Sequence, residues 1–199
     1  TGNYVISNYG SYSLGGTDGF KRTKTNQDSY YIKEDKITPT YSTYTFGVFD
    51  GHGLEGHLVS QAIKQFFTYN SNYSNFSTNT GIFQLFSNLS KNNNNSTNFN
   101  GMESGSTVVL THITSDKIIC ANCGDSRAIL ISGNDNSVKA ISRDHKPELP
   151  EEKNRITNAG GRVEKVFGMG PFRVWFKNLD YPGLAMSRSI GDGYAHRVG

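Results

Sequence analysis

The stretch Tyr44-Thr45-Phe46-Gly47-Val48-Phe49-Asp50-Gly51-His52-Gly53 carries the most information about the fold, because an apolar strand leads directly into a glycine-rich turn. Side chains in a strand alternate between faces, so the even-numbered residues from Tyr44 to Asp50 are predicted to share one face. A carboxylate that is half-buried beside apolar neighbours needs a partner, and hard divalent cations prefer oxygen ligands. The stretch therefore suggests a metal site, although an Asp-Gly turn that merely ends a strand explains it equally well.

Length and charge narrow the class of protein. With 199 residues, the chain is long enough for one substantial domain. Its 20 Lys and Arg residues against 17 Asp and Glu residues give a formal net charge of +3, and these charges are dispersed. So weak a charge favours neither nucleic acid nor a membrane surface as a partner. No run approaches the roughly 18 consecutive apolar residues of a membrane span. We expect a protein of the cytoplasm or nucleus, without a nucleic-acid partner.

Cys120 and Cys123 look at first like half of a zinc site or a redox pair, and they are the two cysteines of the chain. They lie in the predicted strand 117–123, where a spacing of three places them on opposite faces. A shared metal ion or a disulfide bond between them is therefore not expected. We expect two buried, reduced thiols.

The remaining pattern predicts two helices followed by a strand-rich second half. Apolar residues repeat at four-residue intervals within 58–67, which is typical of an amphipathic helix, and a second helix is predicted around 82–89. The Asn/Ser-rich segments 69–80 and 91–101 are predicted to be loops. A third helix is predicted to begin at Pro150 and to end before Gly160-Gly161. Strands are predicted at 28–32, 107–114, 117–123, 127–132, 138–141, 162–167, 173–175 and 184–186. This grouping favours an antiparallel α+β architecture.

Five aspartates lie at predicted strand ends or in glycine-containing turns. Acids that meet at the mouths of strands can form a metal cluster, although a single aspartate in such a place is more often a turn former. These residues are Asp28, Asp50, Asp125, Asp144 and Asp192.

Seven short motifs follow one another along the chain. They are Thr25-Asn26-Gln27-Asp28-Ser29, Phe49-Asp50-Gly51-His52-Gly53, Gly105-Ser106-Thr107, Asn122-Cys123-Gly124-Asp125-Ser126-Arg127, Asp144-His145-Lys146-Pro147, Asn158-Ala159-Gly160-Gly161 and Met186-Ser187-Arg188-Ser189-Ile190-Gly191-Asp192. In this order they resemble the metal-dependent protein phosphatases of the protein phosphatase 2C type, over nearly the whole chain. Arg173-Val174-Trp175, followed by Pro182-Gly183-Leu184-Ala185, resembles the plant and protist members in particular.

The resemblance implies a fold and an activity. The fold would be an αββα sandwich, in which helices flank two antiparallel β-sheets. The activity would be hydrolysis of phosphoserine or phosphothreonine in a phosphoprotein substrate, by a water that two Mg²⁺ or Mn²⁺ ions activate. A weaker third ion would bind nearby. Residues 1–199 are then expected to form a single catalytic domain that is incomplete at its C-terminus.

The resemblance also implies a set of metal ligands. Asp50 would bridge two metal ions, and the Gly51 carbonyl would ligate one of them. Asp28 and Gln27 would support the second ion, with Gln27 standing where many relatives have Glu. Asp144 matches a ligand of the weaker third ion.

Catalytic and supporting roles follow from the same comparison. Besides Asp50, the catalytic residue would be His52, which matches a general acid that protonates the departing oxygen. The alternative is a purely structural role for His52, as a turn histidine that caps the following helix. Asp125 and Asp192 match supporting acids.

Two features depart from the family pattern. Many relatives place a phosphate-binding Arg where this chain has Thr23, so Arg22 or Lys24 is expected to bind the substrate phosphate instead. The chain also stops at Gly199, before a segment that supplies two further metal-ligating aspartates in the family. Two alternatives stay open, and the two departures favour the first of them. One is a catalytically impaired phosphatase-like module that binds phosphoproteins or regulates a partner, and the other is a structural domain whose acids only form turns.

Overall fold

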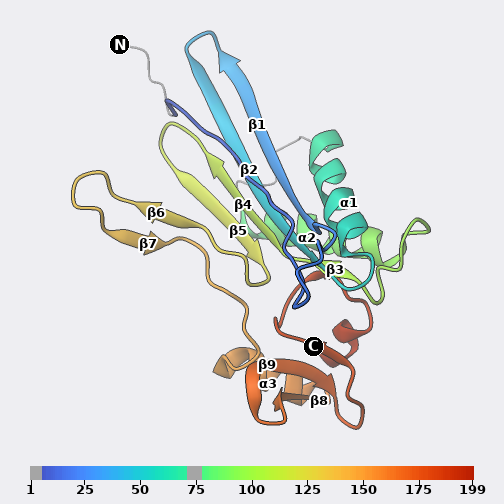
Figure 1. The fold of residues 1–199 in the computed structure, drawn as a ribbon. Helices are drawn as coiled ribbons and strands as arrows, with labels where there is room; N and C mark the ends of the chain where they lie inside the picture. Colours follow the sequence, from blue (N-terminus) through green and yellow to red (C-terminus); the bar gives the residue numbers. More distant parts are fainter. Residues whose placement is uncertain (1–5, 71–77) are drawn as a thin grey trace.

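The computed structural model describes residues 6–70 and 78–199. Its largest element is a six-stranded antiparallel sheet (Figure 1). Five strands run in the order β11-β3-β2-β4-β5, and β1 pairs with β2. The six strands are β1 (Asp28–Thr38), β2 (Tyr41–His52), β3 (Gly105–Ser106), β4 (Val108–Ile113), β5 (Ile118–Cys123) and β11 (Ile190–Gly191).

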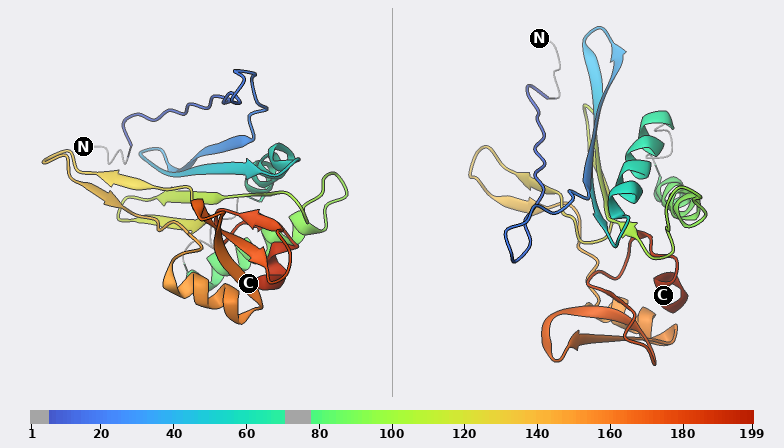
Figure 2. Two further views of the ribbon diagram at one scale, coloured as in Figure 1. Left: turned by 60° about the horizontal axis from the view of Figure 1, so that its bottom comes forward. Right: turned by 45° about the vertical axis from the view of Figure 1, so that its right-hand side comes forward.

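Different layers cover the two faces of this sheet. The helices α1 (Gly56–Tyr69) and α2 (Asn79–Asn94) lie on one face, as the right-hand view of Figure 2 shows. The N-terminal segment lies on the other face, where the ring of Tyr9 contacts the rings of Tyr44 and Phe46. The hairpin of β6 (Ile129–Ile131) and β7 (Val138–Ala140) extends on that side too.

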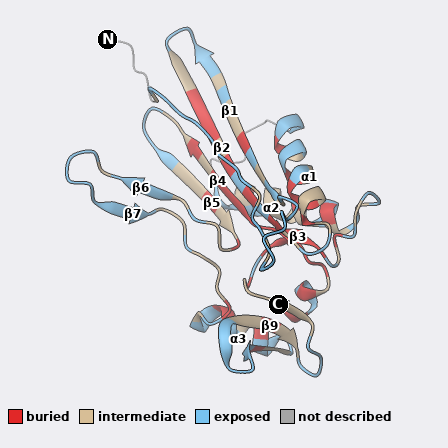
Figure 3. Cartoon of the chain, in the orientation of Figure 1, coloured by how far each residue is buried: buried red, intermediate tan, exposed pale blue. Residues whose placement is uncertain are grey.

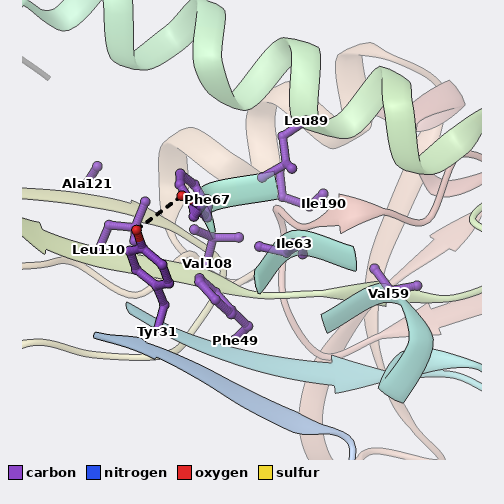
Figure 4. Packing of buried hydrophobic residues seen from close by; sticks show 10 residues of the cluster. All are labelled: Tyr31, Phe49, Val59, Ile63, Phe67, Leu89, Val108, Leu110, Ala121 and Ile190. Carbon is purple, nitrogen blue, oxygen red and sulfur yellow. Dashed lines mark hydrogen bonds between the residues drawn. The ribbon is translucent and has the colours of Figure 1, made fainter. Parts of the chain in front are cut away.

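The main core lies between the sheet and the two helices. Aromatic and aliphatic side chains from β2, β4 and α1 point toward one another there, with the rings of Phe49 and Phe67 stacked at 5.8 Å between centroids (Figure 4). Gly47 in β2 leaves room for these neighbours, because a Cβ atom at this position would collide with Leu110 and Phe49. The buried cluster consists of Tyr31, Phe49, Val59, Ile63, Phe67, Leu89, Val108, Leu110, Ala121 and Ile190.

The two faces of β2 differ in burial, because successive side chains of a strand point to opposite faces of the sheet. Phe49 and Thr45 are fully buried against the helices, whereas Val48 on the opposite face is 49% exposed. The even-numbered residues do share a face, as predicted, but the helices cover the odd-numbered face. Asp50 therefore reaches the end of β2 on the more open side of the sheet.

A smaller lobe follows in the chain. The helix α3 (Pro150–Asn158) packs against a three-stranded sheet of β8 (Gly161–Val166), β9 (Met169–Phe176) and β10 (Pro182–Leu184), at the bottom of Figure 1. The chain ends in a 3₁₀ helix, η2 (Ala195–Val198), which also contacts β9. This lobe has its own buried cluster, formed by Ile156, Val163, Val174 and Val198.

Most sequence-based predictions of the fold are confirmed. The chain has the antiparallel α+β class, with helices outside the sheets, and both cysteines are free. Both loop predictions are wrong at their ends: residues 91–94 and 79–80 belong to α2, and Tyr69 belongs to α1. The buried side chain of Asn93 donates to the Leu89 carbonyl oxygen at 2.8 Å, so tertiary packing overrides the weak helix propensity of asparagine. Most of the predicted loop 69–80 lies outside the described residues.

Burial is concentrated where the sheet meets the helices, and the β6–β7 hairpin is exposed along both strands (Figure 3). Within residues 6–70 and 78–199, none of the helices has the length and hydropathy needed to span a lipid bilayer.

Candidate active site

Two carboxylates lie side by side at the ends of β1 and β2. Asp28 and Asp50 are direct register partners in this antiparallel pair. The Asp50 backbone is held on its other side by Thr107, whose hydroxyl accepts from the Asp50 N–H at 3.0 Å and whose N–H donates to the Asp50 carbonyl oxygen at 3.0 Å. Burial and the neighbouring Asp28 charge raise the pKa of Asp50 above its ordinary value. A cation near both carboxylates would relieve this repulsion.

The turn after Asp50 requires glycine. A Cβ atom on Gly51 would collide with the backbone oxygens of Gln27 and Gly56, and the Gly51 N–H donates to the Gln27 carbonyl oxygen at 3.2 Å. The Gln27 side chain lies in the same crowded region, where its Nε2 donates to the Gly53 carbonyl oxygen at 3.1 Å. Its Oε1 atom is buried and accepts no hydrogen bond from the part of the chain that the structure describes. The fold thus brings Gln27, Asp28, Asp50 and Gly51 together.

His52 is held by an acid from the far end of the chain. Its Nε2 atom lies 2.6 Å from Oδ2 of Asp192, a residue that is only 4% exposed. The same Oδ2 accepts from the Ser189 hydroxyl at 2.5 Å. Burial lowers the pKa of His52, but the hydrogen bond and the charge of Asp192 outweigh it, so the pKa lies above its ordinary value. The contact therefore favours protonated His52. Since α1 has no side-chain cap, the helix-capping alternative is wrong.

The other two predicted acids form ion pairs. Asp125 accepts from Lys146 Nζ at 2.5 Å. Asp144 accepts from Arg127 Nε at 2.9 Å and from its NH2 at 2.8 Å, and this guanidinium lowers the pKa of Asp144. Asp125 is close enough for its charge to contribute to the raised pKa of Asp50, after burial and Asp28.

The two candidate phosphate-binding residues differ in position. Lys24 lines a cavity of about 230 Å³ together with Gln27, Asp28 and Gly51. Arg22 is instead paired with Asp18, its Nε lying 2.7 Å from Oδ2, and it is well exposed. The structure therefore associates Lys24 with the acidic end of the sheet, and not Arg22.

The chemistry of this group of residues fits a hard divalent cation. It offers two adjacent carboxylates, a buried amide oxygen without a hydrogen bond and a glycine-lined turn. Across residues 6–70 and 78–199, however, no three His, Cys, Asp or Glu side chains come close enough to form a metal-binding group by themselves. Further oxygen ligands, such as water, would have to complete the coordination.

Sequence reasoning missed the partners of the site residues. The motifs singled out Asp192 and Asp144, but not their contacts with His52 and Arg127. It also missed Glu152, a buried carboxylate on α3 that binds Arg188. The available signal was the presence of Arg188 between two small polar residues in the same motif as Asp192, which alone does not identify a partner.

The fold and the site together define an antiparallel α+β protein with two paired acids, and a histidine bonded to a third acid, at one end of its main sheet. A sequence profile described as Protein phosphatase 2C matches residues 13–198. The relative "Probable protein phosphatase 2C 72" from Arabidopsis thaliana is 34% identical over 203 residues, covering 91% of this chain and 60% of the relative. "Probable protein phosphatase 2C 35" from the same plant is 30% identical over 205 residues, covering 88% of this chain and 57% of the relative.

Solved structures agree on the fold. A serine-threonine phosphatase 2C from Toxoplasma gondii superimposes with a TM-score of 0.66 at 18% identity, covering 94% of this chain and 68% of that chain. A sex determining protein of C. elegans superimposes with a TM-score of 0.67 at 21% identity, covering 94% of this chain and 45% of that chain. The chain belongs to the protein phosphatase 2C family, which confirms the resemblance seen in its motifs. It spans less than two thirds of the length of these plant relatives.

Proposed function

We propose that this protein is a metal-dependent protein serine/threonine phosphatase that hydrolyses phosphoserine and phosphothreonine in phosphoprotein substrates. The observation that carries the proposal is the placement of Asp28 and Asp50 next to each other. His52, two residues after Asp50 in β2, is bonded to Asp192. Membership of the protein phosphatase 2C family and similarity to the plant protein phosphatases support the same activity.

Asp28, Asp50, the Gly51 carbonyl and Gln27 would hold two Mg²⁺ or Mn²⁺ ions, whose oxygen preference matches these groups. Bound cations of this kind would supply an activated water and would neutralise charge on the phosphoryl group. Asp144, as a ligand of a weaker third ion, would have to exchange its ion pair with Arg127 for the metal. Asp125 would support the site through its charge near Asp50.

His52 would act as the general acid. Because Asp192 favours the protonated imidazole, His52 can donate a proton to the departing serine or threonine oxygen. Such a proton transfer contributes typically ~10²–10⁴ in rate. His52 and Asp192 also line a cavity of about 300 Å³ with Arg173 and Tyr181 from the smaller lobe, so the histidine is accessible from that side.

Lys24 would bind the substrate phosphate as a point charge, in place of the arginine that many relatives carry. Its position in the cavity beside Asp28 and Gly51 supports this role. Arg22 would need to leave Asp18 to contribute. That residues 1–199 act as one catalytic domain, in the cytoplasm or nucleus, stays a prediction.

Hydrolysis of an aryl phosphate tests the proposal, with Mn²⁺ added and the longest natural form that contains residues 1–199. We expect metal-dependent turnover that Asp50→Ala abolishes, because this substitution removes a carboxylate that would hold the proposed ions. Asp116→Ala in the turn after β4 removes an exposed carboxylate elsewhere and serves as the matched control, with turnover kept. Turnover that Asp50→Ala leaves unchanged would exclude the proposed role of Asp50.

A further inference from the structure

A buried carboxylate outside the proposed catalytic residues lies on α3. Glu152 is 2% exposed and accepts hydrogen bonds from Arg188 Nε at 3.0 Å, from Arg188 NH2 at 2.6 Å and from Arg155 NH2 at 2.9 Å. Burial raises the pKa of Glu152, but the hydrogen bonds from Arg188 and Arg155 outweigh it and lower the pKa to about 2. The carboxylate is therefore charged, and its hydrogen-bond partners are two arginines, Arg155 and Arg188.

These contacts fix the beginning of the segment that carries Asp192. Arg188 donates to Glu152 from both Nε and Nη2 of its guanidinium group. Arg155 also donates to the Ser187 carbonyl oxygen at 2.7 Å. The Ser187 N–H donates to the His145 carbonyl oxygen at 2.9 Å. Two consecutive residues of the segment are thus anchored to the smaller lobe.

The end of the same segment is fixed to the candidate active site. The Asp192 N–H donates to the Ser104 carbonyl oxygen at 3.0 Å, and the Asp192 carboxylate binds His52 and Ser189. Asp192 has a φ of 50°, an unusual backbone conformation for a non-glycine residue that its surroundings must hold in place. Between the two anchors lie Ser189 and the short strand β11, which pairs with β3. A shift at Arg188 would therefore reach the Asp192 carboxylate within four residues.

We propose that Glu152 is a positioning residue for the pair of His52 and Asp192, which it orients by holding Arg188 at the start of the segment that carries Asp192. The inference rests on the proposed catalytic role of His52, but the contact itself can be observed without turnover. A structural role in the smaller lobe alone would leave the contact between His52 and Asp192 intact when Glu152 is changed.

The test is NMR spectroscopy of the ¹⁵N-labelled chain, following the Nε2–H proton of His52. A proton in a short hydrogen bond between an imidazole N–H and a carboxylate resonates far downfield and is protected from exchange with water. Asp192→Asn assigns the signal by removing it. We expect Glu152→Gln to abolish the signal and Glu151→Gln to keep it, because Glu151 is an exposed neighbour that pairs with Arg143. A signal that persists unchanged in folded Glu152→Gln would overturn the proposal.

Two further variants separate positioning from general destabilisation. Val163→Ala weakens the core of the smaller lobe without touching the segment 187–192, and we expect it to keep the signal. Loss of the signal in Val163→Ala as well would overturn the proposal, because any damage to the lobe would then suffice. If Glu152→Gln does not fold, Arg188→Lys keeps the charge but loses the fork; we expect a signal broadened by exchange, and an unchanged signal would refute the role.

Enzyme kinetics gives an independent test, with the longest natural form of the protein that contains residues 1–199. We expect Glu152→Gln to lower kcat by about 10-fold to 100-fold with KM nearly unchanged, since misplaced catalytic groups cost about this much. In an Asp192→Asn background the same substitution should add no further loss. Additive losses would contradict an action through Asp192. If wild-type turnover is absent but Glu152→Gln still removes the NMR signal, the proposed function fails and the positioning role stands.

Discussion

The site depends on contacts between residues that are far apart in the chain. His52 and Asp192 are 140 residues apart, yet their side chains meet at 2.6 Å. The motifs predicted that both residues matter, because seven motifs in the family's order are specific, whereas the Asp-Gly-His-Gly turn alone is a weak signal. They did not predict the contact, since pairing across such a distance depends on the fold of everything between. The same limit applies to Asp144, which was predicted as a metal ligand and is paired with Arg127 here.

A buried ion pair also makes stability depend on pH. The lowered pKa of Glu152 determines whether stability rises or falls with pH. Its pKa in the folded chain is about 2, below the ordinary value of about 4.3 in an unfolded chain. A lowered folded pKa means that the stabilisation is fully present above the unfolded value and is lost as the pH falls towards about 2.

We expect the free energy of unfolding, measured by urea denaturation and circular dichroism, to fall as the pH drops from about 5 towards about 2. Glu152→Gln should be less stable at neutral pH but should show a flatter dependence over this range. Glu151→Gln, which removes an exposed carboxylate, should keep the wild-type slope. Equal slopes for wild type and Glu152→Gln would show that the pair does not contribute.

Strands and helices were easier to predict than individual contacts, because their hydrophobic periodicity is visible in short stretches of the sequence. The alternation in β2 and the four-residue repeat in α1 each reflect one buried face, and both elements occur where the pattern places them. α2 extends further than predicted, since Asn93 is buried and bonded within the helix, and composition alone favoured a loop. Which face of β2 the helices cover also required the structure, because apolar residues occupy both faces.

β2 offers a matched pair of substitutions that tests this account of the core. Phe49→Ala should lower the free energy of unfolding by about 3–5 kcal/mol, because it leaves a cavity among α1, β4 and β2. Val48→Ala, next to it on the more exposed face, should cost much less. Thermal and urea denaturation of both variants measure the difference, and similar losses at the two positions would contradict the assignment of the faces.

At the scale of the whole molecule, the larger sheet and the smaller lobe both contribute to one site. The sheet provides Asp28, Asp50 and His52, and the chain that returns from the smaller lobe provides Asp192 (Figure 1). The α+β class was predictable from the grouping of elements, whereas the return of the segment 187–192 to β3 was not, because its strand has only two residues. The lobe also lines the cavity beside His52, so changes in its position would change access to the site.

Isothermal titration calorimetry with Mn²⁺ tests whether Asp28 and Asp50 together hold divalent cations. It compares wild type, Asp28→Asn, Asp50→Asn and the exposed control Asp116→Asn. We predict measurable binding that each of the first two substitutions weakens by at least about 10-fold, which corresponds to about 1.4 kcal/mol, while the control binds as wild type does. Mn²⁺ binding of equal affinity in wild type and Asp50→Asn would contradict the account.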